Sequence, residues 1–474
     1  MNIALTACVM LLSGCVSMSG IEPQAKITQA DTLATGKNIS FAPRIVRPTD
    51  EWWKAYRDAQ LNDLIVKATV DSPTLRIAKA RVALALAFAD GMHAETLPNI
   101  NADGAMTRER FTAMQFIPPP WGGNTDWNNR AAVSLGYDLD LWGRQESNWH
   151  AFVDETRTAA AEAQQVKLEL QTAIVRSYIQ LAMQFTLRDI AEQHQELIEQ
   201  RVSIARRGLA AGIATEMEVS EAETSLPAAH AQIEAIDARI GLLRNQLAAF
   251  AGQGPGAGDA IARPVINLDA PVGLPDRLSA NLIGRRPDVQ ALRWRVEAAQ
   301  RRIEGAKAEF YPDINLLAFA GLQAIGFGQL ISNAAAIAGV GPAISLPIFD
   351  GGRRRSHLSA QAASYDIAVE NYNEALVRSL QDVSDQLVVL NANARQRGDA
   401  EQALHMAKKA HELARNSYLA GLSNYQHVLD NHAVVLRQQE AVAQLQAVRL
   451  DTYAGLMRAL GGGFTDSSLE TKQP

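Results

Sequence analysis

The sequence predicts a mainly helical protein that also carries four short strands of the kind found in a membrane β-barrel. Long stretches with helical periodicity predict the helices, and alternation of apolar and polar residues over 131–141 predicts a strand. An internal repeat shows that each half of the chain contributes the same set of elements. After residue 20 there is no run of 18 apolar residues, so no spanning helix is expected.

Composition excludes several classes of protein. The formal net charge of -6 argues against a nucleic-acid-binding protein, which usually carries a basic stripe. A hydrophobic content of 47% argues against disorder. Both cysteines, Cys8 and Cys15, fall within the first 15 residues, so the body of the chain has no disulfide, zinc knuckle or thiol catalyst. We therefore expect no cofactor in the body.

The N-terminus resembles a bacterial lipoprotein signal. The apolar stretch 3–12 is long enough for a signal-peptide core and too short to span a membrane. The following Leu-Ser-Gly-Cys motif resembles a lipobox, in which the Cys15 thiol receives the lipid, palmitate included. We expect a signal peptide at 1–14 and a lipid-anchored extended tether at 15–48. No Lys or Arg precedes the apolar core, which departs from the usual signal, and an ordinary secretory peptide is the alternative.

Two copies of one unit make up the rest of the chain, at 49–260 and 261–463, followed by a polar tail at 464–474. Pro73 recurs as Pro287, 214 residues later, and Gly212 recurs as Gly421, 209 residues later. The spacing of 209 stays constant over about 110 residues. So long a period indicates duplication of a whole unit rather than a short-repeat solenoid.

Each unit begins with a helical segment and continues into two strands. The first helical segments, 61–95 and 289–309, end before Leu-Pro or Tyr-Pro, where a helix is disfavoured. The strands that follow are expected at 99–111, 131–141, 313–322 and 337–349. Eleven residues are about what a tilted strand needs to cross a bilayer. The apolar positions expected on the barrel strands are Ala131, Val133, Leu135, Tyr137, Leu139, Ile344 and Leu346.

A very long helical hairpin completes each unit. The long helices are expected from Arg144 to about 211 and from Arg353 to about 420, with heptad spacing typical of a coiled-coil seam. Gly212 and Gly421 are suited to the position just after a helix end. The patterns Thr-x-x-Glu from residue 215 and Ser-x-x-Gln from residue 423 predict capping boxes for the returning helices, which run to about 250 and 460.

These features resemble the TolC-like outer-membrane efflux factors of the NodT lipoprotein type. The resemblance covers residues 52–463 and depends on six motifs in the right order on a duplicated frame. They are Trp52-Trp53, Tyr-Asp-Leu-Asp-Leu-Trp-Gly-Arg at 137–144, Arg-Arg-Pro-Asp-Val at 285–289, Gly341-Pro342, Pro-Ile-Phe-Asp-Gly-Gly-Arg at 347–353, and Leu-Gly-Gly-Gly at 460–463.

The resemblance implies a homotrimer whose twelve-stranded barrel continues into a long periplasmic helical barrel. Four strands cannot close alone, and open sheet edges are not tolerated in lipid. The family implies a passive outer-membrane duct that works with a periplasmic adaptor protein and an inner-membrane RND-type transporter in Gram-negative bacteria. The adaptor would dock at the helix turns, and the residues expected there are Leu209, Gly212, Ile213, Leu419, Gly421 and Leu422. The two glycines also fit a purely structural role in the turns.

An acidic residue shortly after the second turn narrows the closed end in this family, and Asp430 occupies that place. Ala433 stands where a basic partner is often found, so the sequence does not indicate an Asp–Arg pair. Glu221 lies 209 residues before Asp430, and both are candidates for the constriction. Acidic residues near a helix start also complement the helix dipole, which is the alternative interpretation.

Other functions remain as alternatives. Within the duct class, protein secretion of type I competes with small-molecule export. A structural periplasmic coiled-coil lipoprotein is a further alternative, although such a spacer has no use for two bilayer-length hairpins. An enzyme is not expected, since the sequence has no phosphate loop, nucleophile elbow or compact His/Asp/Glu cluster. Four histidines between 405 and 432 are too dispersed to predict a metal site.

Overall fold

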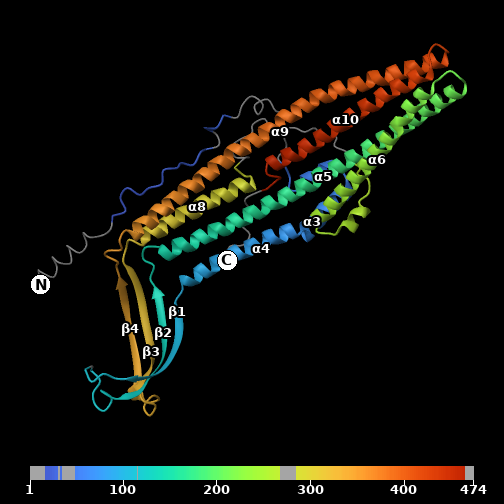
Figure 1. Ribbon diagram of the computed structural model, residues 1–474. Coiled ribbons are helices and arrows are strands. Elements are labelled where there is room, and N and C mark those ends of the chain that lie inside the picture. The colour runs from blue at the N-terminus through green and yellow to red at the C-terminus, as the bar shows by residue number, and fades with distance from the viewer. Residues whose placement is uncertain (1–16, 30–31, 35–47, 115, 267–283, 465–474) are drawn as a thin grey trace. The chain divides into compact units, whose positions relative to one another are not determined.

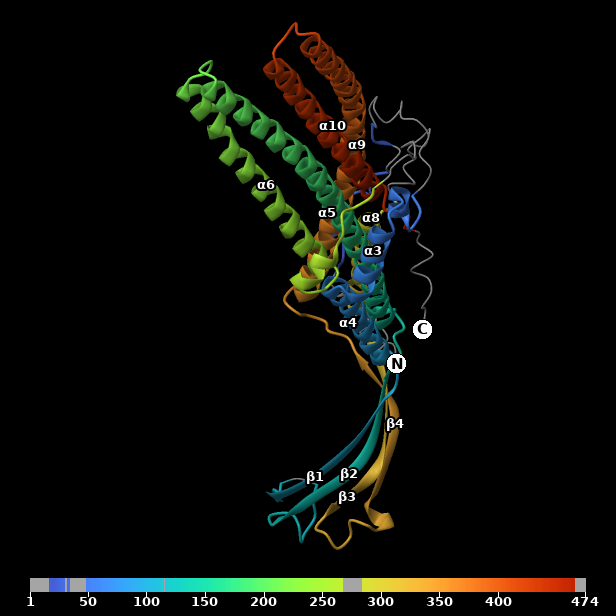
Figure 2. The ribbon, with the colours of Figure 1, turned by 90° about the vertical axis from the view of Figure 1, so that its right-hand side faces the viewer.

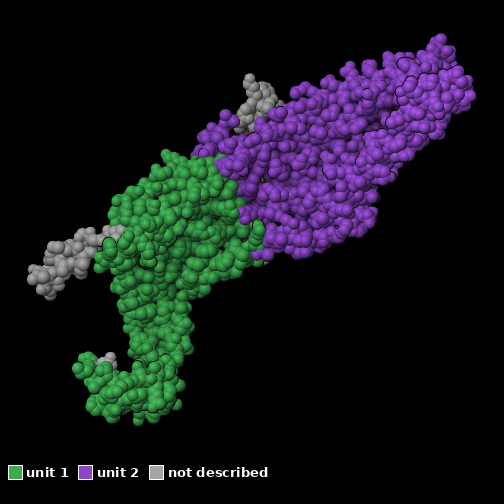
Figure 3. All heavy atoms as spheres, viewed as in Figure 1, with its two compact units in different colours: residues 1–27, 81–159, 291–373 green, residues 28–80, 160–290, 374–474 purple. Residues whose placement is uncertain are grey.

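The computed structural model describes residues 17–29, 32–34, 48–114, 116–266 and 284–464. These residues form two compact units, shown in different colours in Figure 3. Unit 1 contains residues 1–27, 81–159 and 291–373, and unit 2 contains 28–80, 160–290 and 374–474. Each compact unit therefore combines segments from both sequence repeats. Among the described residues, no helix is long and apolar enough to cross a membrane.

The sheet of unit 1 has four antiparallel strands in the order of the sequence (Figure 1). The strands are β1 (Asn99–Arg110), β2 (Thr125–Asp138), β3 (Asp313–Ile325) and β4 (Ala336–Ser345). All four strands predicted from the sequence are present, although several ends differ. β2 begins six residues earlier than predicted and ends three residues earlier, β3 ends three residues later, and β4 ends four residues earlier. β2 ends before Asp140, whose φ of 38° leaves the extended region. β4 ends before Pro347, which has no N–H to offer a ladder.

One face of this sheet is apolar. Directly opposed residues point to the same side, so Ile100, Leu135, Ala318 and Val340 form one row across all four strands. The neighbouring row, on the other face, contains Asn101, Ser134, Phe319 and Gly339. Ile100 and Val340 are 67% and 77% exposed, so no other part of the described chain covers the apolar face.

The predicted barrel positions lie on this apolar face or just beyond it. Ala131, Val133, Leu135 and Tyr137 belong to β2, and Ile344 belongs to β4. Leu139 follows the end of β2, and its N–H still donates to the Ile314 carbonyl at 3.0 Å. Leu346 follows the end of β4.

The first helical segment of repeat 1 is two helices, where the sequence predicted one. α3 (Ala59–Asp71) and α4 (Pro73–Glu95) are separated at Ser72, whose ψ of 125° is extended. Pro73 disfavours a helical conformation at the residue before it and suits the first position of a new helix. The corresponding segment of repeat 2 is the single helix α8 (Pro287–Ala308).

Each repeat contributes one long helical hairpin, α5 with α6 and α9 with α10 (Figure 2). α5 (Arg144–Ala210) and α9 (Arg353–Leu419) each have 67 residues, and α6 (Glu216–Phe250) and α10 (Tyr425–Ala459) each have 35. These equal lengths follow from the constant spacing of 209 in the sequence. α6 begins at the predicted capping box of Thr215 and Glu218. α10 is capped by Asn424 rather than by the predicted Ser423, because the helix starts one residue later.

The hydrophobic core of unit 2 gathers residues from several of these helices. Trp52, Trp53 and Tyr56 pack with Ile174 and Tyr178, and all five are buried. Leu243 and Leu247 of α6 and Leu387 of α9 join the same cluster. Part of the predicted coiled-coil seam, such as Leu387, is therefore core, whereas Ala394, seven residues later on α9, is exposed.

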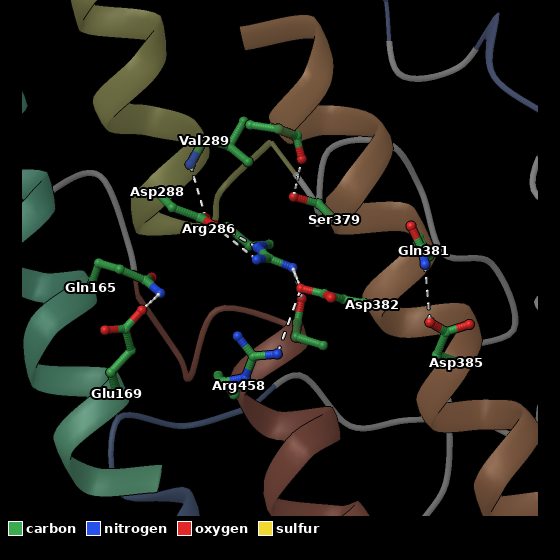
Figure 4. A network of polar contacts seen from close by, with 12 residues as sticks. Gln165, Glu169, Arg286, Asp288, Val289, Ser379, Gln381, Asp382, Asp385 and Arg458 are labelled. Atoms are coloured by element: carbon green, nitrogen blue, oxygen red, sulfur yellow. Dashed lines mark hydrogen bonds and ion pairs between the residues drawn. The ribbon is translucent and has the colours of Figure 1, made fainter. Parts of the chain in front are cut away.

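A buried arginine connects three elements of unit 2 (Figure 4). Arg286 precedes α8 and is 4% exposed. Its guanidinium donates to Asp288 at 2.8 and 3.0 Å, to Asp382 of α9 at 3.0 Å, and to the Ala459 carbonyl at the end of α10 at 3.4 Å. Burial by itself lowers the pKa of Arg286, but the bonds to Asp288 and Asp382 outweigh it and raise this pKa above its usual value.

Candidate functional site

The helix turns of unit 2 form the candidate site, and we name them the first tip (residues 208–216) and the second tip (residues 417–425). Gly212 and Gly421 have φ values of 71° and 74°, which a residue with a Cβ rarely adopts. The N–H of Ile213 donates to the Gly208 carbonyl at 2.9 Å, and the N–H of Leu422 donates to the Ser417 carbonyl at 2.9 Å. Both turns therefore satisfy the carbonyl groups that the ending helix leaves free.

Apolar side chains project from both tips. Ile213 is 84% exposed and Leu422 is 82% exposed. Leu209 and Leu419 are exposed as well. The sequence predicted that these residues contact an adaptor protein. In the described chain their side chains are exposed and therefore accessible to such a partner.

An ion pair links the two hairpins next to the second tip. Arg201 of α5 donates to Asp430 of α10 at 2.5 Å, and the Gln426 amide donates to the same carboxylate oxygen at 3.2 Å. The Tyr425 hydroxyl donates to the Gln200 amide oxygen at 3.2 Å, which adds a second polar contact between α5 and α10. Asp430 thus has a basic partner, although the sequence around it indicated none.

The partner was missed because it comes from the other repeat, 229 residues away in the sequence. Ala433, at the place where a local basic residue was sought, packs instead against an apolar cluster of Leu197, Leu429 and Leu436. That cluster packs α5 against α10. The sequence does show a basic residue near the first tip, because Arg201 lies one helical turn or more before it. Nothing in the sequence pairs Arg201 with Asp430.

Glu221 lies apart from Asp430. It is an exposed residue of α6, and α6 packs against α5 through Val202, Ile198 and Ala229. α5 in turn packs against α10. Among the described residues, Asp430 pairs with Arg201, and no hydrogen bond or ion pair joins it to Glu221.

A histidine pair is the second feature that sequence reasoning missed. The rings of His411 on α9 and His432 on α10 are stacked, with centroids 4.8 Å apart and an angle of 30° between their planes. Burial lowers the pKa of His432, and so does His411, whereas Glu196 of α5 acts in the opposite direction. Within the described ranges, no three His, Cys, Asp or Glu side chains are placed to hold a metal ion.

Part of the predicted tether is packed against the rest of unit 1. We name residues 17–26 the strap. Asp366 of α9 accepts hydrogen bonds from the N–H groups of Gln24 and Ala25 at 2.8 and 2.9 Å. The Asn373 amide donates to the Lys26 carbonyl at 3.0 Å, and Arg355 donates to the Ser17 carbonyl. The strap is thus bonded along about five turns of α9, and the predicted lipid site Cys15 and signal peptide 1–14 lie outside the described residues.

Apolar contacts hold the same strap. Met18 and Ile21 pack against Ile303, Phe310 and Leu358 of unit 1. The first residues of the strap therefore contact the N-terminal end of α9. That end follows β4 closely in the sequence.

Comparisons with known proteins agree with this architecture. The family model described as "Outer membrane efflux protein" matches residues 64–253 and 278–462. The fusaric acid resistance protein FusA of Burkholderia cepacia is 42% identical over 369 residues, which are 76% of this chain and 69% of that protein. The multidrug resistance outer membrane protein MdtP of Escherichia coli K12 is 30% identical over 465 residues, covering 96% of this chain and 94% of the relative.

Solved structures give the same result. The outer membrane protein VceC of Vibrio cholerae superposes with a TM-score of 0.81 at 32% identity, covering 88% of this chain and all of that one. The CmeC outer membrane channel of Campylobacter jejuni has a TM-score of 0.82 at 18% identity, with 94% of this chain and 96% of CmeC covered, and it supports the fold alone.

The fold and the comparisons define an outer-membrane channel protein of Gram-negative bacteria. The chain belongs to the outer membrane efflux protein family. The fold predicted from the sequence, a four-stranded share of a membrane barrel with long helices and internal duplication, is confirmed. The chain is accordingly an outer-membrane duct of a tripartite efflux system.

Proposed function

We propose that three copies of this chain form the duct and that the Arg201–Asp430 ion pair keeps its periplasmic end closed until an adaptor protein docks at the tips. The observation that carries this proposal is the ion pair itself, which joins the hairpins of both repeats beside the second tip. Opening such an end requires the hairpins to separate, and separation breaks this pair.

Sheet geometry supports the assembly of several copies. β1 and β4 are the edge strands of the four-stranded sheet, and each leaves one row of N–H and C=O groups without a strand partner in the described chain. Lipid does not tolerate such edges, so β1 of one copy pairs with β4 of the next until the barrel closes. Three copies give twelve strands, an even number as in other bacterial barrels.

Exposed apolar residues at the tips support adaptor docking. Ile213 and Leu422 are almost fully exposed at the two turns, and an apolar helical hairpin of a partner would bury them. The inner-membrane partner would be an RND-type transporter. The relatives' names, fusaric acid resistance and multidrug resistance, favour small molecules over proteins as the cargo.

A covalent lipid at Cys15 is the remaining part of the proposal. The strap places the described chain from Ser17 onward against the part of α9 that follows the sheet. A lipid attached two residues earlier would be within about 7 Å of chain reach from Ser17. That position suits an acyl anchor entering the membrane that the sheet crosses.

The closure proposal is tested by the substitution Asp430→Asn. Trimers of the variant in planar bilayers should show a several-fold higher conductance than wild type. The reason is that the neutral amide of Asn binds the Arg201 cation more weakly than the charged carboxylate does. Glu412→Gln is the matched control, since Glu412 is an exposed carboxylate of α9 near the same tip, and its conductance should equal wild type. Equal conductance for Asp430→Asn and wild type would refute closure by this ion pair.

A further inference from the structure

We propose that the stacked pair of His411 and His432 makes closure of the duct sensitive to acid, so that the second tip loosens as the pH falls below neutral. The inference rests on the proposed closure at Arg201 and Asp430 and adds a regulator to it. It concerns the α9–α10 contact, whereas the ion pair concerns the α5–α10 contact.

The geometry places the two rings between the helices of the second hairpin. His411 lies on α9, eight residues before the helix ends at Leu419, and its Nδ1 lies 3.3 Å from the Val428 carbonyl of α10. His432 lies on α10, and its ring is stacked on that of His411 at 4.8 Å. Val428 is buried, so its contact with His411 is part of the packing that joins α9 to α10.

The distance between the rings decides what acid does to them. Two neutral imidazoles stack favourably, whereas two imidazolium ions at this distance repel each other in a partly buried place. His411 and His432 are both half-buried, so water screens this repulsion only in part. Protonation therefore acts directly on the contact that holds the hairpin together.

The surrounding charges do not remove this effect. Glu196 of α5 faces His432 and is the carboxylate that favours its protonated form. On α9, the cationic Lys408 and Arg415 lie three and four residues from His411, at the spacing of neighbours on one helix side. On α10, Asp430 is paired with Arg201. On α5, burial lowers the pKa of His194, and the charge of Arg201 lowers it further.

The sign follows from the lowered pKa of His432. Above the ordinary histidine pKa of about 6.5, the ring is neutral in both the closed and the separated hairpin, and closure loses nothing. Below that value, the separated hairpin gains a proton that the closed hairpin resists, so closure weakens as the pH falls from about 6.5 toward the lowered pKa. Each unit of lowering changes the ratio of open to closed states about tenfold.

The histidine pair lies close in sequence to the Arg201–Asp430 ion pair. His432 is two residues after Asp430 on α10, so a shift of α10 relative to α9 also displaces the carboxylate that Arg201 holds. Acid would thus assist the adaptor by lowering the free energy needed to separate the hairpins.

The test is the conductance of full-length trimers in planar bilayers at pH 7.5 and at pH 5.5. This range lies above the ordinary titration of exposed carboxylates. Wild type should conduct several-fold better at pH 5.5, and the double variant His411→Gln, His432→Gln should lose this increase. His405→Gln is the matched control, because His405 is an exposed histidine of α9 two turns away, and it should respond as wild type does.

Two results would overturn the inference: a wild-type conductance that does not rise at pH 5.5, or a double variant that responds as strongly as wild type. Assembly of the double variant is checked by its heat-modifiable oligomer at pH 7.5, and each single variant, which should keep a reduced response, replaces it if the oligomer is lost. Failure of the closure proposal is seen separately, because it concerns Asp430→Asn at pH 7.5.

Discussion

Single arginines connect segments that lie far apart in this sequence. Arg286 belongs to a short motif before α8, and its side chain bonds Asp288, Asp382 and the Ala459 carbonyl in a buried place. Arg201 likewise connects α5 to α10 near the second tip, through its bond to Asp430. The two differ in burial, since the Arg286 side chain is 5% exposed and that of Arg201 is 32% exposed. Arg286 therefore matters mainly for stability, and the more exposed Arg201 suits a contact that opens.

The residue-scale prediction is that Arg286→Met destabilises unit 2. The change leaves Asp288 and Asp382, whose side chains are 32% and 34% exposed, without the guanidinium that bonds both of them. The loss of these hydrogen bonds between charged groups costs about 1.5–3 kcal/mol of unfolding free energy. Thermal unfolding in detergent should show a clearly lower midpoint. Arg285→Met is the control, because Arg285 is exposed, and its midpoint should stay within error of wild type. Equal midpoints for both variants would contradict the role given to Arg286.

At the scale of elements, α9 carries out different tasks along its length. Its first part binds the strap through Asp366, Asn373 and Arg355. Its middle part supplies Val383 and Leu387 to the core of unit 2. Its last part pairs with α10 through His411. A helix of 67 residues can serve all three because its rows of side chains meet different neighbours along its length.

The element-scale prediction is that Asp366→Ala releases the strap. Its carboxylate accepts two backbone N–H groups, and a hydrogen bond to a charged group contributes about 1.5–3 kcal/mol. Trypsin should then cut after Lys26 several-fold faster, as followed by mass spectrometry of the N-terminal peptides. Asp399→Ala, at an exposed position of α9, should be cut at the wild-type rate. An unchanged rate for Asp366→Ala would show that Asp366 does not retain the strap.

At the scale of the whole molecule, the sheet is a share of a larger structure. Its apolar face is uncovered in the described chain, and its two edge strands lack partners. A lone four-stranded sheet of this kind is stable only where lipid meets the apolar face and other strands meet the edges. The long helical hairpins are polar enough to remain in water, which is why the mean hydropathy of the whole chain is only -0.10.

The whole-molecule prediction compares two adjacent positions of β2. Val133→Arg places a charge on the apolar face, where arginine near the middle of a bilayer costs about 2–4 kcal/mol. The yield of heat-modifiable trimer in the outer-membrane fraction should fall strongly. Ser134→Arg puts the same side chain on the opposite face, and its yield should stay near wild type. Equal losses in both variants would contradict the assignment of the two faces.

The sequence by itself determined the elements and their order. The alternation in 131–141, the glycines at the turns and the capping box at Thr215 each act over a few neighbouring residues, so their physical effects can be predicted locally. The repeat then predicts that the same elements recur in the second half of the chain. The break at Ser72 was missed although Pro73 signals it, because the helical periodicity continues on both sides. The N-cap of α10 is Asn424, whereas the sequence predicted Ser423. This difference of one residue is within the range in which helix ends vary.

Only the tertiary structure decided which distant residues meet. Arg201 and Asp430 are 229 residues apart, and the strap and Asp366 are more than 340 residues apart. Stacking of His411 on His432 depends on the rotation of α9 against α10, which helical periodicity alone does not fix. Periodicity states which residues share a face of one helix, but the choice of neighbour for that face is made by packing, and the proposed closure and its response to acid both depend on that choice.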